Sequence, residues 1–355
     1  MGNNNLLHKK FAEIDLKDVF FDSLREDYEG FDRWFQGKSE QDAYVQYDNT
    51  GKVTGFLYLK IEKEAVPDVK PILIAKKILK VGTFKINAHG TKMGEQFIKV
   101  IMDYALNEAV DVCYVTTFSK QEKLINLITQ FGFIEYGIKA NGKRREKVFV
   151  KDMRKLTGDI CLDFPKVNFA NKRKYMLSIY PKYHSVMFPD SILTTENKDI
   201  ITDISYTNSI HKIYVCSMLG VENLRNGDIV VLYRTADGEK SAEYSSVATS
   251  ICVVEEVKLQ SDFNNFEEFY KYSCQYSVFE QADLWYWYKR GGLKAIKLTY
   301  NAALKKRIVR HDLIEKLGLR REVYWGFFEL SNQEFMSIVK AGEVSDSIIL
   351  NKQMF

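Results

Sequence analysis

The segment NAHGTKMGEQF (87–97) places two glycines four residues apart, where an apolar, β-rich run gives way to a helical pattern. The first turn of a helix leaves backbone N–H groups unpaired and lies at the positive end of the helix dipole. Glycine lets an anion approach such a backbone closely. A diphosphate would meet donors of this kind in Gly90, Lys92, Met93 and Gly94. The segment matches neither of the phosphate-binding motifs GxxxxGK[ST] and GxGxxG. The alternative to a phosphate-binding loop is therefore an ordinary strand-to-helix turn.

The elements around this segment are expected to form one compact α+β unit. One or two short helices are predicted within 11–36, followed by a strand, strand, strand, helix, strand, helix, strand, strand order. The ranges are 43–64 for a hairpin around Asn49–Gly51, 71–86 for a strand, 94–109 for a helix, 111–118 for a strand, 119–133 for a helix and 133–153 for a hairpin around Asn141–Gly142. The glycine segment thus joins the third strand to a helix with one apolar face.

Two polar side chains of this unit are candidates for catalysis. Ser119 opens the second helical pattern with Glu122 three residues later, which is the spacing of a capping box. Glu64, like Glu62, stands at the end of a strand, where a carboxylate can act as a base. Each also has an ordinary structural interpretation, which is helix capping for Ser119 and solvent exposure for Glu64.

The order of elements resembles the GNAT acetyltransferase family, and QFGF (130–133) is similar to the family's closing K-L-G-F. The resemblance covers about residues 10–153 and implies acetyl-CoA as cofactor. It implies a pyrophosphate loop at His89, Gly90, Thr91, Lys92, Met93 and Gly94, where only Gly94 strictly matches the family's R/Q-x-x-G-x-G/A. It implies pantetheine pairing, where the family's strands splay, with Val81, Thr83, Phe84 and Ile86, and a thiol near Ser119. The family's tyrosine acid falls on Ile128, so acid–base chemistry must come from another group or from water.

Composition and charge indicate a folded globular protein. Hydrophobic residues make up 46% of the chain, and no apolar run approaches the ~20 residues of a membrane span. The five cysteines are widely spaced without a CxxC, so we expect reduced thiols, a cytoplasmic location and no metal. Lys and Arg outnumber Asp and Glu by 20 to 11 in 51–155 and by 11 to 2 in 289–321. This uneven charge indicates local anion sites.

The second half of the chain has a different pattern of predicted secondary structure, with short strands and helices between them. A strand and a turn are expected in 174–188. Further strands are predicted at 212–218, 228–235, 247–257 and 293–300, and helices at 263–272, 310–317 and 331–339. This pattern predicts a small β-barrel domain with peripheral helices.

Two stretches of this half, LSIYPKY (177–183) and LRNGDIVVLYRT (224–235), resemble PUA-like domains of the ASCH/EVE type. That resemblance implies binding of RNA or a modified base, although the type's Gly-x-Lys-x-x-Glu segment has no counterpart in FPDSILTTENK (188–198). Phosphates require cations and bases require stacking surfaces. The candidate nucleic-acid contacts are Lys182, Tyr183, His184, Tyr233, Arg234, Trp285, Trp287, Lys289 and Arg290. Strand-like alternation would put Trp285 and Trp287 on one face.

We therefore expect a GNAT-like domain at 1–153, a linker at 154–172 and a PUA-like domain at 173–355. The leading hypothesis is an acetyl-CoA-dependent N-acetyltransferase directed to RNA or an RNA-bound acceptor, with a toxin or defence role by analogy alone. The alternatives are a catalytically weakened protein that binds CoA and nucleic acid, and a protein N-acetyltransferase. A protein partner and a homodimer stay open.

Overall fold

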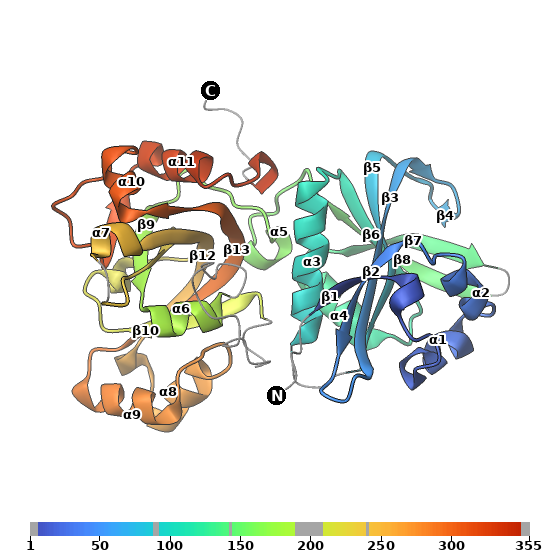
Figure 1. Cartoon of the computed structure of the whole chain (residues 1–355), viewed down its shortest axis with the longest axis horizontal. Helices are drawn as coiled ribbons and strands as arrows, with labels where there is room; N and C mark the ends of the chain where they lie inside the picture. The colour runs from blue at the N-terminus through green and yellow to red at the C-terminus, as the bar shows by residue number, and fades with distance from the viewer. Residues whose placement is uncertain (1–5, 88–91, 142–143, 189–208, 239–240, 349–355) are drawn as a thin grey trace. The chain divides into compact units, whose positions relative to one another are not determined.

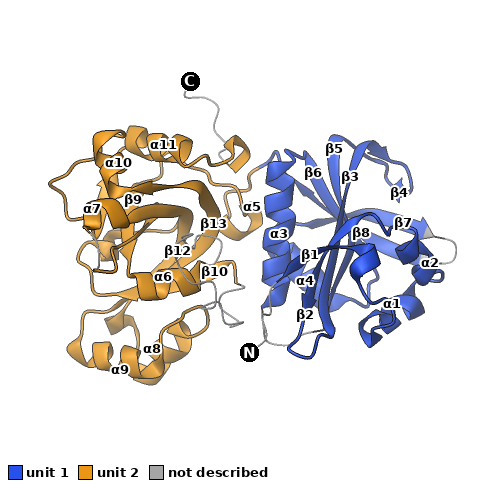
Figure 2. Ribbon diagram, viewed as in Figure 1, with its two compact units in different colours: residues 1–155, 202–208 blue, residues 156–201, 209–355 orange. Residues whose placement is uncertain are grey.

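The computed structural model describes the chain except residues 1–5, 88–91, 142–143, 189–208, 239–240 and 349–355. The chain divides into two compact units (Figure 2). Unit 1 comprises residues 1–155 and 202–208, and unit 2 comprises residues 156–201 and 209–355. Residues 156–172, for which we expected a linker, are therefore part of unit 2. The N–H of Val167, for example, donates to the carbonyl of Ile348 at 2.9 Å.

Unit 1 contains strands and helices in nearly the predicted order (Figure 1). Its strands are β1 (Leu7–Lys10), β2 (Asp42–Tyr47), β3 (Val53–Val66), β4 (Val69–Lys70), β5 (Leu73–Ile86), β6 (Val112–Thr117), β7 (Ile134–Asn141) and β8 (Arg144–Asp152). Its helices are the 3₁₀ turns η1 (Phe11–Glu13) and η2 (Val19–Phe21), then α1 (Asp22–Asp27), α2 (Phe31–Gln36), α3 (Met93–Asn107) and α4 (Glu122–Gln130). Both predicted hairpins are present, whereas β1 and β4 are too short to give a sequence pattern.

The strands of unit 1 form one mixed sheet in the order β1-β2-β3-β5-β6-β8-β7-β4. The β5–β6 pair is parallel and the other pairs are antiparallel. A parallel pair requires a crossover, and α3 supplies it. The sheet is therefore antiparallel on both sides of one parallel junction between β5 and β6.

Helices cover both faces of this sheet: α3 and α4 lie on one face, and α1 and α2 on the other (Figure 1). The apolar residues of α3 recur at helical spacing, so Phe97, Ile98 and Ile101 are all buried. On the opposite face the core is aromatic. Phe11 packs edge-on against Phe56 of β3, with ring centroids 5.5 Å apart.

Unit 2 contains a second sheet with several short helices. Its strands are β9 (Lys174–Ile179), β10 (His211–Cys216), β11 (Ile229–Arg234), β12 (Val247–Leu259), β13 (Lys294–Val309) and β14 (Phe327–Leu330). Its α-helices are α5 (Ile160–Asp163), α6 (Pro181–Met187), α7 (Ala242–Ser245), α8 (Phe266–Ser273), α9 (Gln281–Arg290), α10 (Arg310–Glu315) and α11 (Asn332–Ala341). The last helix begins with a capping box, because the Ser331 hydroxyl accepts from the N–H of Glu334 at 3.1 Å and Glu334 accepts from the N–H of Ser331 at 2.7 Å.

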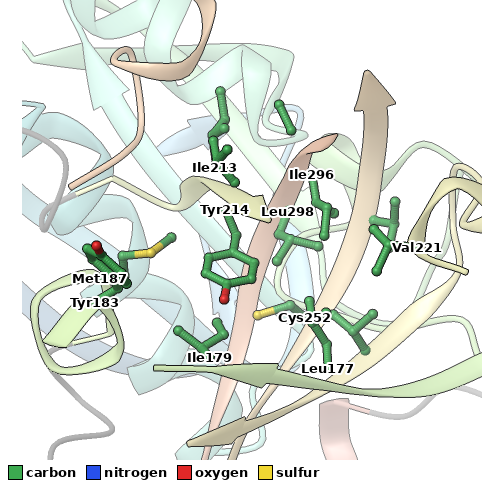
Figure 3. Packing of buried hydrophobic residues seen from close by; sticks show 14 of the residues in the cluster. Leu177, Ile179, Tyr183, Met187, Ile213, Tyr214, Val221, Cys252, Ile296 and Leu298 are labelled. Carbon is green, nitrogen blue, oxygen red and sulfur yellow. The ribbon is translucent and has the colours of Figure 1, made fainter. Parts of the chain in front are cut away.

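The sheet of unit 2 has the order β10-β13-β12-β11-β9-β14. The long β12–β13 pair has three register shifts, which bend the two strands. Strands β10 and β14 are edges, so the pairing in the described ranges forms an open sheet rather than a closed barrel. Its core includes Leu177 and Ile179 of β9, Tyr214 of β10 and Leu298 of β13 (Figure 3).

Two segments of unit 2 differ from the sequence prediction. Residues 181–187 form the helix α6 instead of a turn, with Pro181 at its first position, where a proline fits without loss. Residues 281–290 form the helix α9, so the strand-like alternation expected for Trp285 and Trp287 is wrong. Aromatic residues favour strands by propensity, but packing against neighbouring helices overrides that preference here.

Candidate functional site

The parallel junction of unit 1 opens partway along its length. Strand β5 pairs with β6 from Ile78 opposite Val112 to Val81 opposite Val115, and the register ends there. Strand β5 continues for five more residues, to Ile86. The backbone of this last part of β5 is not paired with β6. This is where we expected the two strands to separate.

A β-bulge lies at the start of this opening. On β3, Tyr58 is opposite Thr83 and Leu59 is opposite Val81, which leaves Gly82 as an extra residue. A Cβ atom on Gly82 would lie 2.6 Å from Cδ1 of Tyr58. The Tyr58 ring is fixed by its hydroxyl, which bonds to Gln41 and accepts from the Lys38 ammonium at 3.1 Å. Glycine is therefore required at this bulge, which redirects β5 at the opening.

Helix α3 begins just beyond the predicted pyrophosphate loop. Of the six loop residues, His89, Gly90 and Thr91 lie outside the described residues. Lys92 has a left-handed φ of +52° and precedes the first helical residue, Met93. The Met93 side chain is buried, so its backbone N–H is the group that is placed to meet a ligand.

Gly94, the second residue of α3, has a packing role of its own. A Cβ atom there would lie 2.7 Å from Cδ2 of Leu127 on α4. The close approach of the two helices therefore explains this glycine without a ligand. Its backbone N–H lies in the first turn of α3, where an anion can also accept from it, so the pyrophosphate role stays a prediction.

The other predicted cofactor residues lie along the open part of β5. Val81 is buried, and Thr83, Phe84 and Ile86 are half-buried. The Phe84 ring packs against Phe97 of α3, with centroids 5.5 Å apart. These side chains are therefore partly engaged in the core, and the backbone of this stretch is the surface that remains for an amide-bearing ligand.

A buried carboxylate that the sequence did not single out lies on β8 beside this opening. Glu146 is 6% exposed and accepts two hydrogen bonds at Oε1. The Tyr28 hydroxyl donates at 2.7 Å, and the Thr116 hydroxyl donates at 3.2 Å. Thr116 directly follows Val115, the last residue of β6 that pairs with β5. Glu146 is thus one strand away from the point where the sheet separates.

A second hydrogen-bonded pair, of which the tyrosine is buried, lies further along the same face of β6. The Tyr114 hydroxyl donates to Oε2 of Glu62 at 2.7 Å, and the Glu62 carboxylate is 3.3 Å from the Lys60 ammonium and 3.8 Å from that of Lys80. Burial and the hydrogen bond to Glu62 raise the pKa of Tyr114 far above its usual range. Tyr114 therefore keeps its proton at neutral pH and is a poor general acid.

The two predicted catalytic residues are exposed. Helix α4 begins at Glu122 with Gln121 as N-cap, so the capping box expected from Ser119 is wrong. Ser119 lies in the turn that joins β6 to α4. Glu64 has a left-handed φ of +68° opposite a bulge of β5, six residues from Tyr58, which is about 20 Å along a strand. Ser119 is thus near the open end of β6, whereas Glu64 is remote from it.

Some predicted nucleic-acid contacts of unit 2 are buried. Tyr183 packs against Phe279, with ring centroids 4.4 Å apart, and Tyr233 packs against Trp325 at 5.2 Å. His184 is fully buried, and its Nε2 lies 2.8 Å from Oγ1 of Thr249.

Electrostatics keep this buried histidine neutral. Burial, together with the positive charges of Arg234 and Arg307, lowers the pKa of His184 to about 3. Arg234 is itself 5% exposed. His184, Tyr183, Tyr233 and Arg234 therefore belong to the interior of unit 2 rather than to a surface that a phosphate backbone would meet.

Of the other predicted contacts, Trp285, Lys289 and Arg290 are exposed on α9 and Lys182 is exposed on α6. Trp285 is 43% exposed and Tyr286 is 60% exposed. The Lys289 ammonium lies 4.6 Å from the Trp285 ring centroid, and the Arg290 guanidinium lies 5.6 Å from that of Tyr286. Helical spacing produces both pairs, since each cation is four residues after its ring. We call these four residues the α9 surface.

Two further predicted contacts border the α9 surface. Lys182 on α6 is exposed, and its ammonium lies 3.3 Å from the Asp283 carboxylate on α9. Trp287 faces inward, with its ring 6.0 Å from that of Tyr183. The helix thus separates the two tryptophans that a strand would have placed together.

In unit 1 the elements follow nearly the order that the GNAT resemblance implies, with a mixed sheet flanked by helices. Unit 2, for which the sequence predicts a PUA-like barrel, has an open sheet with peripheral helices. Among the described residues, no helix is both long and apolar enough to cross a membrane.

Comparison with solved structures finds similar folds of both kinds. An ASCH protein of Zymomonas mobilis is 7% identical, with 47% of this chain and 94% of that chain covered at a TM-score of 0.34. An IAA acetyltransferase of Bacillus cereus is 16% identical, with 42% and 99% covered at 0.30. A GNAT family acetyltransferase of Elizabethkingia anophelis with acetyl-CoA bound is 11% identical, with 42% and 99% covered at 0.31. At such values these likenesses say nothing of substrate or mechanism in this chain.

Neither family models nor curated proteins provide a match. No family model matches the sequence. No curated protein matches it either.

Proposed function

We propose that the protein is an acetyl-CoA-dependent N-acetyltransferase that acts on an amine of RNA or of an RNA-bound molecule. The opening of the sheet after Val81 and Val115, next to the buried Glu146, carries this proposal. An opening between parallel strands gives a ligand access to strand backbone from one face and to a carboxylate from the other. Both are needed to bring a thioester and an amine together.

The residues around the opening fit the cofactor. The backbone of 82–86 can pair with the amides of a pantetheine arm, as a strand edge pairs with an added strand. The N–H groups of Met93 and Gly94 begin α3 and can hold a pyrophosphate, with Lys92 beside them. When bound, acetyl-CoA supplies an acetyl group activated as a thioester.

Glu146 is placed to prepare the acceptor. An amine must lose a proton before or during its attack, and a carboxylate within hydrogen-bond reach can take that proton. The hydroxyls of Tyr28 and Thr116 fix Oε1 and leave Oε2 of Glu146 as the atom that faces an incoming ammonium. Because the carboxylate is buried, its attraction for a cation is stronger than at a solvated surface. Glu146 thus both attracts the amine and removes its proton.

The acid that protonates the leaving thiolate is not a tyrosine of α4. Ile128 occupies the position where the GNAT resemblance places that tyrosine, and it is buried. Tyr114 is excluded by its raised pKa. Ser119 is exposed next to the open end of β6, so its hydroxyl is the polar side chain of this segment that can relay a proton from solvent.

The α9 surface supports an RNA-bound acceptor. Bases stack on exposed aromatic rings, and phosphates pair with Lys and Arg. Trp285 and Tyr286 offer two such rings. The flexible cations Lys289 and Arg290, which cover the rings in the free protein, can turn to phosphates when bases replace them.

Two measurements on the full-length chain test this function. Isothermal titration should show that acetyl-CoA binds with one site per chain. Release of free thiol from acetyl-CoA should then accelerate when cellular RNA is added and should stop when the RNA is digested beforehand. Absence of acetyl-CoA binding would overturn the enzymatic proposal. Binding with thiol release that is unaffected by RNA would instead indicate a protein N-acetyltransferase.

A further inference from the structure

Three side chains with metal-ligating atoms gather in unit 2, away from the α9 surface and the buried His184. They are Cys161 of α5, His211 of β10 and Glu255 of β12. One ligating atom from each, a thiol sulfur, a ring nitrogen and a carboxylate oxygen, lies within 4.8 Å of the other two. All three side chains are partly buried. The function proposed above makes no use of them.

The sheet places two of these residues on strands that flank the same strand. Strand β13 lies between β10 and β12, and Thr299 pairs with both His211 and Val253. Glu255 is the extra residue of a bulge, since Val254 pairs with Leu298 and the next paired residue is Glu256. A bulge redirects the side chain of its extra residue. Glu255 is thereby aimed at His211, and its Oε1 lies 2.5 Å from Nδ1 of that ring.

The third residue is brought over the same strands by the segment that includes α5. The Asn301 side chain of β13 donates to the carbonyl of Pro165 at 3.2 Å, and Thr299 bonds to the Asn301 amide oxygen at 3.0 Å. Asp159 caps α5 by accepting from the N–H groups of Cys161 and Leu162, both at 2.9 Å. These hydrogen bonds fix the position of Cys161 relative to β13.

We propose that Cys161, His211 and Glu255 form a three-ligand site for a divalent transition metal of the zinc type. Thiolate, imidazole and carboxylate are the ligands that zinc takes in proteins, and three of them leave one position open. Ligand atoms around a tetrahedral zinc ion are about 3.4 Å apart, so small side-chain rotations are sufficient to close this site. Calcium and magnesium are excluded because they require mostly oxygen ligands.

Lys297 completes the arrangement. Its ammonium lies 2.8 Å from Oε2 of Glu255, the carboxylate oxygen that does not contact His211. Lys297 thus holds Oε2 in place, as ligating carboxylates commonly are. Oε1, which contacts Nδ1 of His211, can then turn to a metal together with that ring. A carboxylate and a thiolate together carry two negative charges, which a divalent cation and one ammonium more than balance. If Glu255 served only to form an ion pair with Lys297, the thiol of Cys161 and the imidazole of His211 would not be needed beside it.

Metal titration of the full-length chain tests this site. The tag-free protein is stripped with a chelator, then titrated with Zn²⁺ and, separately, with Co²⁺ under reducing conditions. We expect one ion per chain, a cobalt spectrum with a thiolate charge-transfer band, and a rise in Tm with zinc because the ion binds the folded state. Cys161→Ser and His211→Gln should each weaken zinc binding at least tenfold and abolish the charge-transfer band. Cys274→Ser, at another half-buried cysteine of unit 2, should retain both.

The same experiment can overturn the proposal in two ways. Wild-type protein that binds no zinc or cobalt, or a Cys161→Ser variant that binds cobalt with the wild-type spectrum, would exclude this site. Rapid alkylation of Cys161 by iodoacetamide that excess zinc does not slow would instead identify an activated thiol and reject the metal assignment. Circular dichroism of the metal-free variants distinguishes lost ligands from lost fold, since an unfolded variant would lose its spectrum before any metal is added.

Discussion

The hydroxyl of Tyr28 donates a 2.7 Å hydrogen bond to Oε1 of Glu146, which is 118 residues away in sequence. Tyr28 follows α1, which covers one face of the sheet of unit 1, and Glu146 belongs to β8 within that sheet. The bond therefore joins the helical layer to β8, which lies one strand away from the sheet opening. Both hydroxyl donors, those of Tyr28 and Thr116, bind this same oxygen, Oε1.

Glu146→Gln should reduce acetyl transfer by about 10²–10⁴-fold without weakening acetyl-CoA binding, because the amide keeps the shape but cannot accept a proton. Thiol-release kinetics with RNA present and isothermal titration with acetyl-CoA would measure the two effects separately. Glu135→Gln is the matched control, since Glu135 lies on the neighbouring strand β7 with its carboxylate half-exposed. Equal activity of Glu146→Gln and wild type would remove Glu146 from the proposed chemistry.

Tyr28→Phe separates positioning from proton transfer. The variant keeps the carboxylate but loses one of its two donors, so we expect a fall in kcat that is smaller than for Glu146→Gln. The Tyr28→Phe carboxylate is held less firmly at Oε1, so the loss should appear in kcat and not in the affinity for acetyl-CoA. A kcat equal to that of the wild type, with a lower Tm as the only change, would show that Tyr28 serves the fold alone.

Gly94 needs a double variant, since both a pyrophosphate and Leu127 can explain it. Gly94→Val brings a side chain against Leu127 and should lower Tm, whereas Gly94→Val with Leu127→Ala relieves that contact. We expect the double variant to match the Tm of Leu127→Ala but to bind acetyl-CoA at least tenfold more weakly, because the added side chain covers the first turn of α3. Wild-type affinity in the double variant would move the pyrophosphate away from this turn.

The sequence predicts the elements of unit 1 well because each has a strong local pattern. Apolar residues at helical spacing reveal α3, and Asn49–Gly51 between two alternating runs reveals the β2–β3 hairpin. Short edge strands such as β1, with four residues, have no such pattern. They exist because a neighbouring strand offers backbone partners, and only the tertiary structure supplies those.

The functional residues are harder to predict because their meaning depends on pairing between distant segments. Nothing local distinguishes Glu146 from the other acids of a hairpin rich in charge, and its burial beside Thr116 follows from the β6–β8 register. The same holds for Cys161, His211 and Glu255, whose spacing matches no metal-binding motif. Glu64 shows the converse problem. It has the features expected of a catalytic base, an acid near the end of a strand, but it lies far from the opening of the sheet.

Substitutions on the α9 surface should weaken RNA binding by two distinguishable routes. Trp285→Ala removes a stacking ring, which is worth about 1–3 kcal/mol per base, so the Kd for cellular RNA should rise by about 5- to 150-fold. Lys289→Ala should lower affinity and reduce the slope of log K against log salt by about one unit. Fluorescence anisotropy at several salt concentrations measures both.

Matched controls for these variants lie elsewhere in unit 2. Tyr244 is 62% exposed near α10, and Lys316 pairs with Asp312 at 2.9 Å. Tyr244→Ala and Lys316→Ala remove an exposed ring and an exposed cation without changing α9, so both should bind RNA as the wild type does. If these controls weaken binding as much as the α9 variants, RNA contacts unit 2 through general charge and not through this helix.

His184 makes the stability of unit 2 depend on pH in a predictable direction. Its pKa is about 3 in the folded state, whereas an unfolded chain has the ordinary value of about 6.5. Between these values the unfolded state binds more protons, so the free energy of unfolding falls as pH falls, by about 1.4 kcal/mol per unit below pH 6.5. The desolvated ring and the neighbouring Arg234 and Arg307 are the physical causes. His184→Gln should remove this part of the slope, since glutamine does not titrate.

Urea unfolding between pH 4.5 and 7.5 measures that slope in the full-length chain. The chain has four tryptophans, and Trp34 belongs to unit 1 while Trp285, Trp287 and Trp325 belong to unit 2. In a Trp34→Phe background the fluorescence therefore reports unit 2. His8→Gln, at an exposed histidine of β1, should keep the wild-type slope. A His184→Gln variant with the full wild-type slope would mean that other groups carry the acid sensitivity and that His184 is not held neutral in the folded state.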